Sequence, residues 1–152
     1  MQPEIVQRDA FQVVGMRYAG KNENNEIPAL WGQFFHRAEE IRNVTAHEAY
    51  GVCQMVPDLE PGAFEYVAGL PVTSVDGVPE GMVAREIPAQ TYAAFMVPCL
   101  ADIMKTHDHI NREWFPTSGY EHACGPDFEL YPAEFMPGAN ETFYIYIPVK
   151  KA

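Results

Sequence analysis

Hydrophobic residues recur at every second position in several short stretches of this chain, which is the spacing of a half-buried β-strand. The last stretch is a clear case, because Phe143, Ile145, Ile147 and Val149 share one face and Tyr144 lies on the other. Pro71 is expected to end the strand that precedes it, and Pro88 to interrupt another. Strands are predicted at 4–8, 11–18, 50–55, 64–70, 82–87, 91–97, 126–131 and 142–149.

Two other stretches carry apolar residues at helical spacing. Pro28 suits the first turn of the first predicted helix, and Pro116 with Gly119 is expected to end the second. The first stripe comprises Ile27, Leu30, Trp31, Phe34, Phe35, Ala38 and Ile41, and the second comprises Leu100, Ile103, His107, Ile110 and Trp114. Packing against a core is the ordinary role of such a stripe, Trp31 included.

The predicted elements run strand, helix, strand, strand, and this order occurs twice. Ala10 and Ala89 precede similar strands 79 residues apart, and Val72 and Val149 close similar strands 77 residues apart. So long a period indicates a duplicated supersecondary unit. We therefore predict one α+β domain over 1–152, with repeat halves at about 3–73 and 82–150. The βαββ units should pair about a pseudo-twofold axis, with an antiparallel sheet, both main helices on one face and a ligand cleft between the halves.

Charge narrows the range of partners. The 152 residues carry a formal net charge of −11 and no basic cluster beyond Lys150 and Lys151, which disfavours nucleic acid. An acidic field concentrates cationic small molecules, although acidity alone also keeps a protein soluble. The chain has no signal peptide pattern and no apolar run of membrane-spanning length, so no membrane partner is expected. The widely spaced Cys53, Cys99 and Cys124 suggest reduced thiols and a cytoplasmic location.

Motifs for metal, cofactor or nucleophilic chemistry are absent from the sequence. His107 and His109 are two residues apart on a predicted helix and do not share a face, so no metal site is expected there. There is no phosphate-binding glycine loop, and we predict no cofactor. Most glutamates, Glu65 among them, are interpreted as surface charges.

Glu129 is the exception, because it lies in a predicted strand rich in aromatic neighbours. Phe128 and Leu130 face one side of this strand, and Glu129 and Tyr131 face the other. A solvent-facing glutamate is the more common arrangement for such spacing. A buried Glu129 would instead be either neutral and hydrogen-bonded by tyrosines or poised for a cation held against aromatic faces.

Further short motifs make the chain resemble the effector-binding domain of AraC-type and multidrug-sensing MerR-type regulators, which also occurs in gyrase-inhibitor-like proteins. Their order and spacing along almost the whole chain carry the resemblance. They are Ile27-Pro28-Ala29-Leu30-Trp31, Tyr50-Gly51-Val52, Phe64-Glu65-Tyr66-Val67-Ala68-Gly69, Ile87-Pro88 with Tyr92-Ala93, Trp114-Phe115-Pro116-Thr117-Ser118-Gly119-Tyr120, Asp127-Phe128-Glu129-Leu130-Tyr131 and Tyr146-Ile147-Pro148-Val149.

The resemblance implies a duplicated βαββ fold with a ligand pocket between its halves. The pocket glutamate of the family falls on Glu129, and its pocket aromatics fall on Trp31, Tyr50, Tyr66 and Tyr131. Shared face and helix position add Phe64 and Trp114 to the expected site.

The expected function is binding of amphipathic, cationic, drug-like compounds, with Glu129 as the charge partner. Two alternatives use the same chain. One is a hydrolase of strained cyclopropane-type toxins, with Glu129 as acid and base and Tyr131 or Tyr66 assisting. The other is a protective protein that interacts with gyrase. No helix-turn-helix precedes the domain, so we expect no direct DNA binding and leave a separate regulator or gyrase as the protein partner.

Overall fold

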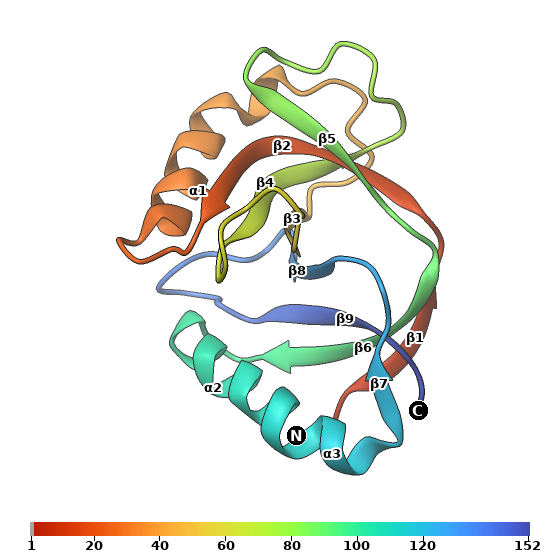
Figure 1. Cartoon of the computed structure of the whole chain (residues 1–152). Coiled ribbons are helices and arrows are strands. Elements are labelled where there is room, and N and C mark those ends of the chain that lie inside the picture. The colour runs from red at the N-terminus through yellow and green to blue at the C-terminus, as the bar shows by residue number, and fades with distance from the viewer. Residues whose placement is uncertain (1) are drawn as a thin grey trace.

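The computed structural model describes residues 2–152 and has the predicted α+β architecture, a curved sheet with helices beside it (Figure 1). The first half of the chain folds as strand, strand, helix, strand, strand. Its elements are β1 (Glu4–Arg8), β2 (Phe11–Gly20), α1 (Glu26–Arg37), the 3₁₀ turn η1 (Ala38–Glu40), β3 (Ala49–Gln54) and β4 (Phe64–Val72).

The second half repeats this order, with a longer helical segment and one additional short strand. Its elements are β5 (Met82–Ile87), β6 (Gln90–Val97), the 3₁₀ turn η2 (Leu100–Asp102), α2 (Ile103–His109), the π-helical turn η3 (Ile110–Trp114), α3 (Phe115–Ser118), β7 (Tyr120–His122), β8 (Asp127–Tyr131) and β9 (Phe143–Lys151).

The strands form one sheet in the order β1-β6-β9-β8-β3-β4-β2-β5, with β7 paired to β9 outside this path. All pairs are antiparallel. The order is symmetric about the β8–β3 pair when β1 to β4 are matched with β5, β6, β8 and β9. Each half lends its first strand to the other, since β1 pairs with β6 and β5 pairs with β2. The pseudo-twofold duplication is therefore confirmed, while the single-domain assignment and the limits of the halves stay predictions.

Buried apolar side chains lie on both faces of this sheet. Helix α1 packs on β2 and β4 through Leu30 and Phe34, and the helical run from α2 to α3 packs on β6 and β9 through Ile110 and Trp114. A further cluster, which includes Tyr50 and Phe128, occupies the opposite face. Figure 1 shows α1 and α2 on the same side of the sheet, with β3 and β8 between them.

Two prolines behave differently from the prediction. Strand β4 continues through Pro71, whose carbonyl accepts a hydrogen bond from the amide of Thr45 at 3.0 Å. The backbone nitrogen of Pro71, which carries no hydrogen, points to that same side, away from β2. The hydrogen bonds between β2 and β4 therefore continue past it. Pro116 lies within α3, which directly follows the π-helical turn η3, and Gly119 with φ 79° ends the helix.

Glu65 is not a surface charge. Its side chain is 2% exposed, and its carboxylate lies 2.7 Å from Arg17 Nε and 2.6 Å from Arg85 Nε. Arg85 donates a further hydrogen bond from Nη2 at 3.0 Å, and Gln54 donates a fourth at 3.0 Å. Arg85, then Arg17, hold the pKa of Glu65 down at about 2 against the opposing effect of burial. Among residues 2–152, no helix combines the length and apolarity that a membrane span needs.

Candidate functional site

A cavity of about 580 Å³ lies between α1 and α2, over strands β3, β4 and β8. Side chains from both halves of the chain form it, and most of them are apolar. They are Asn22, Ile27, Pro28, Trp31, Phe35, Ala49, Cys53, Phe64, Tyr66, Leu100, Ile103, Met104, His107, Glu129, Tyr131, Phe135 and Pro137. A cavity of this size suits one drug-sized molecule.

Strand alternation places the polar groups at the floor of the cavity. Glu129 and Tyr131 project into it from β8, while Phe128 packs into the cluster on the opposite face. Gly51 of β3 is paired directly with Glu129. A Cβ at Gly51 would lie only 2.0 Å from the Tyr66 hydroxyl and 2.8 Å from Glu129 Oε1. The absent side chain at Gly51 therefore makes the space in which these two groups meet.

Glu129 is 9% exposed, and the hydrogen bonds that residues 2–152 make to its carboxylate all reach one oxygen. Tyr66 and Tyr131 donate their hydroxyl hydrogens to Oε1 at 2.7 Å and 2.8 Å. Trp31 Nε1 donates to the Tyr66 oxygen at 2.9 Å, which fixes that hydroxyl. Within residues 2–152, no hydrogen bond reaches Glu129 Oε2. The arrangement presents one unpaired carboxylate oxygen inside an apolar chamber.

Burial sets the protonation of these groups. It raises the pKa of Glu129, while the hydrogen bonds from Tyr66 and Tyr131 and the charge of His107 act in the lowering direction. Burial, followed by the charge of Glu129, raises the pKa values of both tyrosines and of the Cys53 thiol. The tyrosines therefore remain hydrogen-bond donors at neutral pH, and Cys53 remains an uncharged thiol.

Aromatic rings and exposed apolar side chains form the wall and the rim. The Trp31 ring meets Tyr131 edge to face, with centroids 5.3 Å apart. Phe35 is 65% exposed and Met104 is 71% exposed, although both line the cavity. Large apolar side chains left exposed beside a cavity are typical of a ligand-binding surface.

Five of the residues predicted for the site line this cavity: Glu129, Trp31, Tyr66, Tyr131 and Phe64. Tyr50 does not line the cavity. Alternate residues of a strand face opposite sides of the sheet, so Tyr50 faces the side of β3 opposite to Gly51. It is 1% exposed in the cluster on the other sheet face, where its hydroxyl donates to Glu48 at 2.7 Å and accepts from Arg8 at 3.1 Å.

Trp114 also lies elsewhere. It packs edge to face on Phe95, with ring centroids 5.2 Å apart, and stacks on Tyr120 at 6.0 Å. The apolar stripe that contains Trp114 divides between two surroundings. Its first part lines the cavity, whereas Ile110 and Trp114, within the π-helical turn, pack on the sheet.

Sequence reasoning did not assign Gly51 or His107 to the site. In β3 the small residues Ala49, Gly51 and Cys53 alternate with larger ones. This alternation is the signal in the sequence that could have identified Gly51. His107 lies on a predicted apolar stripe, and that position of a polar residue is the signal in the sequence. Nothing in the sequence alone showed which part of the stripe would face a cavity.

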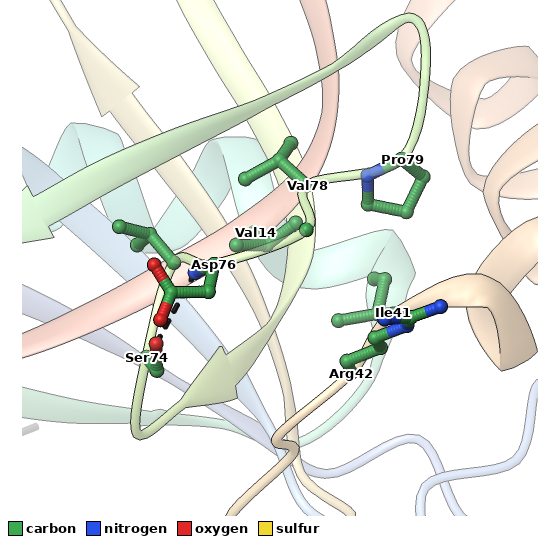
Figure 2. A pocket seen from close by; sticks show the side chains of 9 residues that line it. Val14, Ile41, Arg42, Ser74, Asp76, Val78 and Pro79 are labelled. Atoms are coloured by element: carbon green, nitrogen blue, oxygen red, sulfur yellow. Dashed lines mark hydrogen bonds between the residues drawn. The ribbon is translucent and has the colours of Figure 1, made fainter.

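A second hollow lies near the loop that joins the two halves. Figure 2 shows it between Ile41 and Arg42 on one side and the Ser74–Pro79 loop on the other, with the Asp76 amide bonded to Ser74 Oγ at 3.2 Å. It does not have room for a water-sized molecule. Residues 2–152 also contain no group of three or more side chains placed to hold a metal ion.

A symmetric antiparallel sheet, two helices on one side and a cavity between the halves define an effector-binding domain. The chain belongs to the family of integron-associated effector-binding proteins, Cass2, which it matches over residues 4–149. This confirms the resemblance noted from the sequence motifs.

Characterised relatives extend this assignment. The chain is 38% identical to the transcriptional regulator BrlR of Pseudomonas aeruginosa over 98% of its own length, and it spans 56% of that longer protein. It is 30% identical to a DNA gyrase inhibitor of Erwinia billingiae, over 100% of this chain and 99% of the inhibitor. Among solved structures, SAV2435 bound to tetraphenylphosphonium has a TM-score of 0.76 at 14% identity, covering 99% of this chain and 94% of that one.

Proposed function

We propose that this protein binds amphipathic organic cations in the cavity between α1 and α2, with Glu129 as the counter-ion. The observation that carries the proposal is the unpaired Oε2 of a buried carboxylate in a chamber walled by aromatic and aliphatic groups. An ionised carboxylate without a partner is costly in such surroundings, and a bound cation would remove that cost.

Charge composition inside the cavity supports the same ligand class. None of its lining residues is lysine or arginine, so Glu129 has no permanent cationic partner there. Trp31, Phe64 and Tyr131 offer ring surfaces that attract cations and also accept flat apolar groups. The structural relative SAV2435 was solved with tetraphenylphosphonium, a lipophilic cation, which makes this compound a suitable probe.

Titration of the protein with tetraphenylphosphonium, followed by calorimetry, tests the proposal. Glu129→Gln keeps the shape and removes the charge, and we expect it to lower affinity by about tenfold or more, equivalent to about 1.4 kcal/mol or more. Glu134→Gln is the matched control, because it makes the same charge change on an exposed loop residue and should bind like the wild type. Equal affinity in wild type and Glu129→Gln would contradict the proposal.

Hydrolysis is a second candidate function, supported by the contacts of Glu129. A carboxyl group with a raised pKa, hydrogen-bonded by Tyr66 and Tyr131, has the composition of a general acid–base site. Incubation with a strained cyclopropane compound, followed by mass spectrometry, separates the two functions. Addition of one water to the compound, lost in Glu129→Gln, supports hydrolysis, whereas recovery of intact compound supports binding alone.

A further inference from the structure

His107 occupies a position in the cavity that corresponds to Trp31 in the other half of the molecule. The helices α1 and α2 match at a separation of 76 residues, which aligns the buried Leu30 with Thr106 and Phe34 with Ile110. The same separation aligns three pairs that all line the cavity: Ile27 with Ile103, Pro28 with Met104, and Trp31 with His107. The pseudo-twofold arrangement therefore brings the indole and the imidazole to the cavity from opposite helices.

The two rings differ in their hydrogen bonds. Trp31 donates its N–H to the Tyr66 hydroxyl, which in turn donates to Glu129 Oε1. The His107 ring has no hydrogen-bond partner anywhere in residues 2–152. Its backbone is held, however, because its carbonyl accepts a hydrogen bond from Asn111 Nδ2 at 3.0 Å at the entry to the π-helical turn. The imidazole is thus an available polar group that lines the cavity from a backbone position held by hydrogen bonds.

His107 also differs from every other cavity residue in the charge that it can carry. The chamber is lined by no lysine or arginine, and Glu129 is its only carboxylate. Helix α1 lines the cavity with uncharged residues, and Lys105 and Asp108, beside His107 on α2, are exposed outside it. The ionisable groups that line the cavity with His107 are Glu129 and Tyr131 of β8, Tyr66 of β4 and Cys53 of β3.

We propose that His107 is a specificity-determining residue whose protonation competes with the ligand for Glu129. This inference rests on the proposed cation binding. With neutral imidazole, the carboxylate is available to an organic cation. With imidazolium, the cavity contains its own positive charge, which pairs with Glu129 and repels a second cation.

The expected pH dependence follows from these charges. Histidine normally titrates between about pH 5 and 8, and like charges in a chamber of low polarity repel strongly. Cation affinity should therefore fall as the pH falls. Protonation of Glu129 itself acts in the same direction, so the contribution of His107 has to be separated by a variant that keeps Glu129.

The experiment is a tetraphenylphosphonium titration at about pH 6 and about pH 8.5 with wild type, His107→Gln and His47→Gln, where His47 is an exposed control. We expect His107→Gln to bind roughly threefold or more tightly than wild type at the lower pH and equally at the higher pH. His47→Gln should follow the wild type at both values.

Identical pH profiles for wild type and His107→Gln would overturn this inference and leave cation binding by Glu129 intact. Absence of tetraphenylphosphonium binding at every pH would instead contradict the proposed function and this inference with it.

Discussion

Gly51 and Glu129 are equivalent positions in the two halves of the molecule, and they face each other in the central β3–β8 pair. A glutamate at both positions would put two carboxylates side by side in a poorly solvated place, which is unfavourable. It would also fill the space that the Tyr66 hydroxyl occupies. The duplication therefore has one charged and one empty position at its axis, and this difference produces a site for a single positive charge.

Gly51→Ala should disrupt the cavity floor. The added Cβ would come within 2.0 Å of the Tyr66 hydroxyl, so Tyr66 must move away from Glu129 or the strands must shift. We expect a loss of about 1–3 kcal/mol in the free energy of unfolding, measured in urea, and weaker binding of tetraphenylphosphonium.

Gly32→Ala is the matched control for this substitution. Gly32 lies inside α1, and a Cβ there would meet nothing within 4 Å. Alanine should stabilise that helix by about 0.5–1 kcal/mol and leave binding unchanged. If Gly51→Ala has wild-type stability and affinity, the close meeting of Tyr66 and Glu129 at this glycine is not needed.

At the scale of elements, β1 depends on one cation. In the described part of the chain this edge strand pairs with β6 alone, and its last residue, Arg8, covers aromatic rings on the face of the sheet opposite to the cavity. The guanidinium carbon lies 4.8 Å from the Phe11 ring centroid, 5.3 Å from that of Phe128 and 5.2 Å from that of Tyr146. Arg8 also donates to the Tyr50 hydroxyl at 3.1 Å. These contacts join β1 to strands of both halves.

Arg8→Met should loosen this strand. Methionine retains an apolar stem but loses the charge over the rings and the hydrogen bond to Tyr50, so we expect a loss of about 1–2 kcal/mol in unfolding free energy. Amide hydrogen exchange should rise first in β1 and its partner β6. Arg112→Met, an exposed change in the π-helical turn, should leave both measurements unaltered. Equal exchange in both variants would show that Arg8 does not hold β1.

Most helices and strands could be predicted from the sequence. Which face of each one meets the cavity could not. Alternation and helical spacing identified the strands around Glu129 and both helical segments, because these patterns follow from local geometry. Tyr50 was misplaced because the face of a strand that meets a cavity depends on its register with a distant partner, here β8. The sequence predicts Glu65 as a surface charge because Arg17 and Arg85, which neutralise it, come from separate strands.

At the scale of the whole molecule, two buried carboxylates oppose each other in their effect on stability. The arginines lower the pKa of Glu65 to about 2 from 4.5. Its contribution is therefore fully present above about pH 4.5 and is lost as the pH falls toward about 2. Burial raises the pKa of Glu129 above 4.5. Its contribution is greatest below that value and is lost as the pH rises through the folded-state pKa.

The pH dependence of stability should separate these contributions. Urea unfolding of ligand-free wild type, Glu65→Gln and Glu129→Gln gives two difference curves that should have opposite slopes. Glu65→Gln should cost roughly 2–3 kcal/mol at neutral pH, because Arg17 and Arg85 lose a charged partner, and less as the pH falls below 4.5. The free energy of unfolding of Glu129→Gln should differ least from that of wild type, or exceed it, at neutral pH. Relative to wild type it should decrease as acid protonates Glu129 in the wild type. Glu134→Gln corrects for removing one charge from a chain of net charge −11. Parallel curves for Glu65→Gln and Glu129→Gln would mean that their surroundings do not shift the two carboxyl groups in opposite directions.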